Sequence, residues 1–249
     1  MNPLKYVRTA NIGEIAKFEL EAEAAQPNVI DVNKLPGGLV IGNTLLDVSS
    51  VPSAEVRAGI SLSMLFANRV APHDPGAKDV DSWLAAYQTS LGDLGFRLSG
   101  TARVNSHFHK LNVDVHKAII PFLTIAFGGG AIGPIILSAL DNLQKMKEDS
   151  PWITLFDRET RRFSVQEMHF GAAVANGTET EIRYAVARLH VDLGQTQILF
   201  FRVTKNTADF ESLTTRMSVS NSLMAVMEDD LKTRLSALIK RYIWNANIG

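Results

Sequence analysis

The feature that most constrains this chain is a long uncharged run, Ala118–Leu140, near its middle. Its 23 residues, AIIPFLTIAFGGGAIGPIILSAL, contain no acidic or basic side chain, and that length could cross a bilayer. Helix-breaking residues divide the run into two halves: Gly128, Gly129, Gly130, Gly133 and Pro134. We therefore interpret it as two helices, about 111–127 and 131–147, joined by a glycine turn. Such a hairpin is either a permanent part of a core or a segment that meets lipid after a conformational change.

Three of these glycines also match the dinucleotide-binding pattern G-x-G-x-x-G: Gly128, Gly130 and Gly133. That motif needs a preceding strand, a following helix and an acidic residue some 20 residues on. Ile119–Phe127 and Asp157 could supply the strand and the acid. Pro121, however, cannot donate a hydrogen bond in a central parallel strand, and no second βα unit follows. A nucleotide-binding enzyme therefore remains only as a low-ranked alternative.

Hydrophobic spacing predicts helices on both sides of this run. Ser53 is a good N-cap for a helix that ends at Pro72, and Asp79 or Asp81 begins a second helix that Gly95 closes. A last helix is predicted over about 221–243.

Strands are predicted where the apolar period changes to two. Leu39–Ile41 and then Leu45–Leu46 are interpreted as one extended strand broken by Gly42-Asn43, and residues 96–108 are predicted to form another strand. Four further strands, linked by short turns such as Asn176-Gly177, should form an antiparallel meander: Trp152–Phe156, Phe163–Val174, Ile182–Leu193 and Ile198–Val203.

Together these elements predict an α+β fold. Helical pairs segregated from an antiparallel sheet indicate one layered domain, which we place at residues 39–249, with residues 1–38 as a peripheral N-terminal arm. Neither face of the predicted strand Ile182–Leu193 is purely polar, and Ile198–Phe201 is apolar on both faces, so in water both faces of the sheet must be covered. The candidate membrane-interaction residues are Trp152, Ile153, Leu155, Ile182, Tyr184, Val186, Ile198, Leu199, Phe200 and Phe201.

Composition narrows the function further. The formal net charge is −1, so no basic excess favours nucleic acid, and the near-neutral balance favours self-association. Cysteine is absent, which excludes disulfides and a catalytic thiol. The first residues lack the apolar core of a secretory signal, so we expect synthesis in the cytoplasm without a signal peptide. We expect no metal, no cofactor and no catalytic residue.

Four segments, in order, resemble the Cyt family of cytolytic bacterial toxins: EVRAGISLSMLFANRVAP, HKAIIPFLTIAFGGGAIGPIILSALDNLQ, PWITLFDRET and GQTQILFFRVTKNTADFESL. The resemblance runs from about residue 54 to 213. It implies an antiparallel sheet wrapped by two helical hairpins, at 54–94 and 111–147.

The resemblance also implies a function. A Cyt-like protein is a non-enzymatic cytolysin that acts outside its cell on the phospholipids of target membranes, as a dimer in solution and an oligomer on the membrane. Its hairpins would leave the sheet, and strands would then insert or the protein would disrupt the bilayer. The alternative within the same fold is a non-lytic virulence protein that carries a lipid or fatty acid.

Overall fold

The computed structural model describes residues 2–14, 31, 34–108, 113–114, 119–121, 123–124, 127, 136–138, 140–141, 151–163, 165–190, 202–203 and 208–245. Its named helices are α1 (Pro3–Thr9), α3 (Ala54–Val70), the 3-10 turn η2 (Ala71–His73), α4 (Val80–Asp93), α7 (Pro151–Thr160) and α8 (Asn221–Tyr242). Its strands are β1 (Gly38–Ile41), β2 (Thr44–Ser50), β3 (Arg97–Phe108), β4 (Val113–Asp114), β5 (Arg161–Arg162), β6 (Val165–Asn176), β7 (Glu179–His190), β8 (Arg202–Val203), β9 (Ala208–Ser220) and β10 (Ile243–Asn245).

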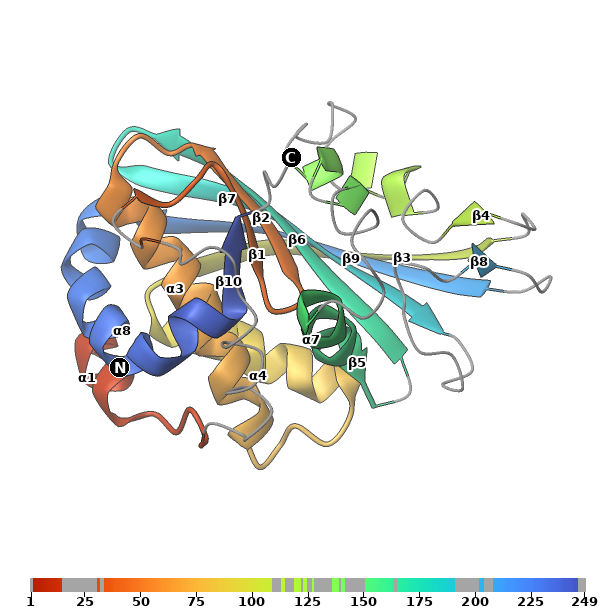
Figure 1. Ribbon diagram of the computed structural model, residues 1–249, viewed down its shortest axis with the longest axis horizontal. Helices are drawn as coiled ribbons and strands as arrows, with labels where there is room; N and C mark the ends of the chain where they lie inside the picture. Colours follow the sequence, from red (N-terminus) through yellow and green to blue (C-terminus); the bar gives the residue numbers. More distant parts are fainter. Residues whose placement is uncertain are drawn as a thin grey trace.

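One eight-stranded sheet organises the molecule. Its order is β10-β1-β2-β6-β7-β9-β3, with β5 paired to β6, and β4 and β8 form a separate two-stranded sheet. The pair β2–β6 is parallel, and the other pairs of the large sheet are antiparallel. Helices lie beside this sheet rather than alternating with its strands (Figure 1), so the predicted α+β class is confirmed.

The helical layer begins where the sequence predicts. The Ser53 side chain accepts the backbone N–H of Val56, and Asp79 forms a capping box with Ser82, so α3 and α4 have well-defined starts. α3 crosses α8 closely at Gly59, where an added Cβ would lie 2.5 Å from the Met224 carbonyl oxygen. Only glycine lets the two backbones approach to this distance.

The two faces of the sheet differ in what covers them. We call inner the face of β6 and β7 that carries His169 and Tyr184, because both side chains contact Tyr87 of α4. The opposite face, which carries Phe170 and Ala185, we call outer. Both of these outer side chains are also buried, so β6 and β7 are covered on both sides at these positions.

The strand predicted at Trp152–Phe156 is wrong, because these residues belong to α7. Pro151 suits the first turn of a helix, and Arg161 lies 2.6 Å from Asp157 one turn earlier, so local chemistry favours the helix. The helix continues to Thr160, through the region between the first two predicted strands.

The predicted meander is correct only at its centre. β6 and β7 form an antiparallel hairpin across Gly177, whose φ of +62° explains the glycine. The next neighbour of β7 is β9, a strand that is not among those predicted, and β6 also pairs in parallel with β2. Ile198–Phe201 lie outside the described residues.

The predicted hairpin 111–147 is described only in part. Val113–Asp114 form a strand paired with β8, so the first predicted helix begins too early. From Ile119 the described residues are helical: the Phe127 N–H donates to the Leu123 carbonyl over 2.9 Å. The glycines Gly128, Gly129, Gly130 and Gly133 lie outside the described residues.

Part of the predicted N-terminal arm packs against the domain. α1 lies beside α8 (Figure 1), Val7 is fully buried, and Arg8 forms an ion pair of 2.9 Å with Asp230. Residues 2–14 are therefore docked, while the boundary between arm and domain at residue 38 stays a prediction. Among the described residues, no helix combines the length and the apolar character needed to cross a membrane.

Candidate functional site

The structure gathers three of the predicted membrane-interaction residues on one face of one strand. Ile182, Tyr184 and Val186 alternate along β7 on the inner face, and all three are buried. Trp152, Ile153 and Leu155 lie on α7 instead of a strand.

The uncharged run contributes buried residues of its own. The described apolar residues with helical spacing are all buried members of the hydrophobic core: Ile119, Leu123, Phe127, Ile136 and Leu140. Figure 1 shows the coloured pieces of this run on the side of the sheet away from α3 and α4. One polar contact joins the run to the sheet, because Nη1 of Arg183 donates to the Phe127 carbonyl oxygen over 2.6 Å.

Beneath α4 the inner face contains a chain of buried polar side chains. The Tyr184 hydroxyl bonds Nδ1 of His169, and Nε2 of His169 lies 2.6 Å from Oε1 of Glu167. The other Glu167 oxygen, Oε2, accepts from Nε of Arg188 over 2.7 Å. The side chains of His169, Glu167 and Arg188 are 0% exposed.

Arg188 also reaches the first turn of α4. Its Nη1 lies 2.6 Å from Oδ1 of Asp81, and its Nη2 donates to the Val80 carbonyl over 3.2 Å. We call Tyr184, His169, Glu167, Arg188 and Asp81 the α4–sheet network, since together they connect the start of α4 to β6 and β7.

Arg103 of β3 adds two ion pairs at the Asp81 end of this network. Its Nη2 lies 2.9 Å from Oδ1 of Asp81, and its Nη1 lies 2.9 Å from Oε1 of Glu211. Glu211 also approaches Arg188, at 3.5 Å. Two arginines and two carboxylates therefore meet where α4 begins.

The charges shift one another in the direction that favours ionisation. The hydrogen bond from Arg188, more than that from Arg103, holds the pKa of Asp81 below its ordinary value. Burial works against the charged form of Arg188, but the Glu167 charge and the bonds to Asp81 and Glu167 outweigh it and raise its pKa. Both side chains therefore remain ionised at neutral pH.

The α4–sheet network can hold the helix but is poorly placed for catalysis. His169, Glu167 and Arg188 are sealed from solvent, so a substrate in solution cannot reach them in this conformation. Removing one charged partner would leave another charge buried and unpaired, which is strongly unfavourable. The arrangement therefore resists separation of α4 from the sheet.

The sequence alone does not predict this network. It does contain a signal: Arg188 falls on the same alternating face of β7 as Ile182, Tyr184 and Val186, where a charge is unexpected. A charge on an otherwise apolar strand face indicates a buried partner. The identity of that partner depends on the pairing of Arg188 with Glu167 across β6 and β7.

The nucleotide-binding alternative loses its structural context. Ile119–Phe127, its required strand, is helical where it is described. Asp157, its expected acid, lies in α7 and pairs with Arg161. The described residues also contain no group of three side chains suited to hold a metal ion.

No protein-family model matches the chain, and no curated protein sequence matches it. Solved structures do match. A delta-endotoxin is 12% identical with a TM-score of 0.38, over 78% of this chain and 86% of its own. The Evf virulence factor is 14% identical with a TM-score of 0.35, over 91% and 90%. Activated Cyt2Ba from Bacillus thuringiensis subsp. israelensis is 15% identical with a TM-score of 0.38, over 72% and 96%.

The solved structures that match thus include the family that the sequence resembles. Those proteins are named as toxins and a virulence factor, and these names describe them and not this chain. At these identities and TM-scores, any function for this chain has to rest on its own residues.

Proposed function

We propose that this chain is a membrane-active, non-enzymatic protein that keeps an uncharged segment against its sheet in water and transfers it to lipid. The observation that carries the proposal is the burial of five described apolar residues of Ala118–Leu140 in the core, although the run is long enough to span a bilayer. The resemblance of the sequence to the Cyt family points the same way.

Hydrophobic transfer supplies the driving force. Fully burying one large apolar side chain is worth about 1.5–3 kcal/mol relative to exposing it to water. If the run separated from the sheet in water, this stabilisation would be lost at each of its five buried side chains: Ile119, Leu123, Phe127, Ile136 and Leu140. A bilayer removes most of that cost, so opening becomes favourable only at a membrane.

The proposal also includes a second movement, which uncovers the inner face of the sheet. If α3 and α4 leave the sheet, Ile182, Tyr184 and Val186 become available to lipid or to another copy of the chain. The α4–sheet network opposes this step, because Asp81 and Arg188 must part. Self-association on the membrane would then re-cover the exposed strands.

A fluorescent label can follow the uncharged run directly, because the chain has no cysteine of its own. Ser138 is exposed, so Ser138→Cys would carry an environment-sensitive dye without disturbing the core. Val226 of α8, 63% exposed, gives the control Val226→Cys. Mixed with liposomes that contain a second, self-quenched dye, the Ser138 label should shift to the blue as dye is released, while the Val226 label should change little.

Two results would overturn the proposal. One is the absence of both dye release and a spectral shift on liposomes of several zwitterionic and anionic compositions. The other is release with equal shifts at Ser138 and Val226, which would indicate general unfolding on the surface. Extraction of lipid without dye release would instead favour the non-lytic lipid carrier.

A further inference from the structure

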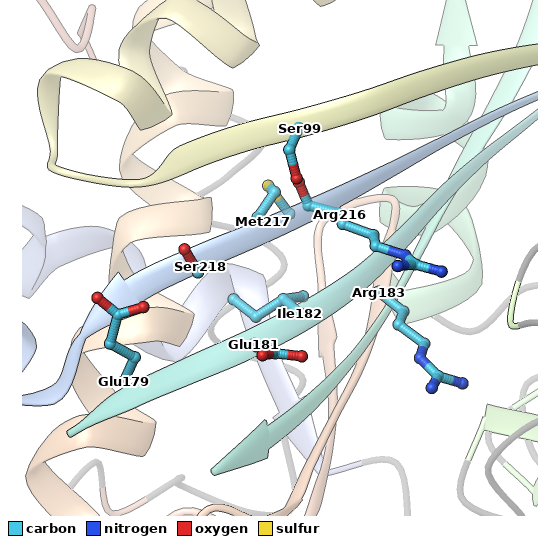
Figure 2. Close-up of a pocket in the computed structure, with 8 residues that line it drawn as sticks. All are labelled: Ser99, Glu179, Glu181, Ile182, Arg183, Arg216, Met217 and Ser218. Atoms are coloured by element: carbon cyan, nitrogen blue, oxygen red, sulfur yellow. The ribbon is translucent and has the colours of Figure 1, made fainter. Parts of the chain in front are cut away.

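Two arginines face each other directly on the outer face of the sheet. Arg183 of β7 and Arg216 of β9 are register partners in an antiparallel pair, so their side chains emerge side by side. Figure 2 shows both guanidinium groups extending toward the same side. Like charges directly opposite each other on a sheet are destabilising, so this pair calls for a compensating charge.

The described part of the chain does not supply that charge. Arg183 donates to a neutral backbone carbonyl, that of Phe127. Within the described part of the chain, neither arginine forms an ion pair with a carboxylate. The two nearby acids are engaged elsewhere: Glu179 pairs with Arg97, and Glu181 accepts from Asn176 over 2.7 Å.

A pocket of about 340 Å³ lies over this pair. Its volume falls in the range of small-molecule sites, about 300–1,000 Å³. It extends across β7, β9 and β3, with lining residues Ser99, Glu179, Glu181, Ile182, Arg183, Arg216, Met217 and Ser218 (Figure 2). Ser99 lies beside Arg216, whereas Ser218 lies with the acids Glu179 and Glu181 toward the other end of the row (Figure 2).

We propose that Arg183 and Arg216 bind the oxyanion of a small phosphate-bearing molecule in this pocket. Planar guanidinium groups bind phosphate oxygens through paired, charge-assisted hydrogen bonds, which are stronger than neutral ones. The anion would remove the repulsion between the two arginines. This inference does not depend on membrane activity, because a phosphate free in solution and one on a lipid headgroup offer the same chemistry.

Phosphate binding at this site can be measured through the melting temperature of the intact protein. Inorganic phosphate is titrated against chloride at constant ionic strength, since a ligand that binds only the folded state raises its stability. Arg183→Gln and Arg216→Gln should each weaken phosphate binding about tenfold, as expected for the loss of hydrogen bonds to a charged group. The matched control is Arg234→Gln, because Arg234 is also exposed and also donates to a backbone carbonyl, that of Ala10.

Melting temperatures measured without phosphate distinguish a phosphate-binding role of the arginines from a purely structural role. In chloride alone, Arg216→Gln should melt at or above the wild-type temperature, because it removes the like-charge pair. In phosphate the order should reverse. If phosphate raises the melting temperature equally in wild type, Arg216→Gln and Arg234→Gln, or in none of them, the proposed site does not exist.

A second experiment distinguishes a lipid headgroup from a soluble phosphate compound as the ligand. Sedimentation with vesicles that contain phosphatidic acid is compared with vesicles that contain only phosphatidylcholine, with the same three variants. Loss of phosphatidic-acid binding in Arg183→Gln and Arg216→Gln assigns the headgroup as ligand. Unchanged vesicle binding, together with a phosphate response that the same substitutions abolish, assigns a soluble phosphate compound.

Discussion

Arg188 and Glu167 face each other across β7 and β6, with Nε and Oε2 2.7 Å apart and both side chains fully buried. This ion pair is the centre of the α4–sheet network, since Glu167 continues to His169 and Arg188 continues to Asp81. It fixes two strands to each other and to the first turn of a helix. Its energetic role can be tested separately from membrane activity.

Glu167→Gln should destabilise the protein by about 3 kcal/mol, because it leaves the Arg188 charge buried with only its outer partners. The measurement is urea unfolding at neutral pH. The control is Glu181→Gln, since Glu181 is exposed and its oxygen can still accept from Asn176; it should change stability by less than about 0.5 kcal/mol. Equal effects of the two substitutions would show that the buried pair contributes nothing special.

Asp81→Asn should make stability less dependent on pH. The folded-state pKa of Asp81 is lowered by the bond from Arg188, so the ionised carboxylate stabilises the fold above the ordinary carboxyl range. That contribution is lost as the pH falls through the lowered folded-state value. Asp81 is 57% exposed, so solvent screening limits the contribution to about 1 kcal/mol or less.

The corresponding measurement is the free energy of unfolding of wild type and Asp81→Asn between neutral and strongly acidic pH. The difference should be largest near neutrality and should vanish in acid. Asp229→Asn removes a charge from an exposed position on α8 and serves as the control. A difference for Asp81→Asn that grows in acid would contradict the assigned ion pair.

Gly59→Ala should destabilise the protein by about 1–3 kcal/mol, although alanine is the better helix former. The added methyl would collide with the backbone of Met224, so α3 and α8 would have to move apart. Gly92→Ala in α4 is the matched substitution, because no atom lies within 4 Å of its added Cβ. It should stabilise the protein by about 0.5–1 kcal/mol, and thermal or urea unfolding of both variants tests the pair.

Asp81→Asn should also accelerate dye release from liposomes, if α4 leaves the sheet during insertion. The substitution weakens the contacts of α4 with Arg188 and Arg103 but has only a small cost in water. Release rates would be compared at equal bound protein, with Asp229→Asn as the control. An unchanged rate would show that separation of α4 does not limit release, while leaving the movement of Ala118–Leu140 to be tested by the Ser138 label.

Local residue patterns are sufficient to predict most of the helices and strands. Capping by Ser53 and Asp79, the period of α8 and the Gly177 turn each depend on residues within a few positions. The α+β class and the boundaries of α3, α4 and α8 could therefore be predicted, whereas the predicted ends of β6 and β7 differ from the observed ones by two and three residues. Trp152–Phe156 shows the limit of this reasoning. A short apolar run fits a strand or a helix equally well, and the ion pair of Asp157 with Arg161 accompanies the helix.

Which residues meet across long stretches of sequence depends on the assembled fold. The pairing of β2 with β6, and of β7 with β9, depends on burial summed over the whole sheet, which no local pattern records. The same pairing places Glu167 opposite Arg188 and Arg183 opposite Arg216. A shift of one residue in either register would move each side chain to the other face, so both the buried network and the arginine pair are products of the assembled sheet.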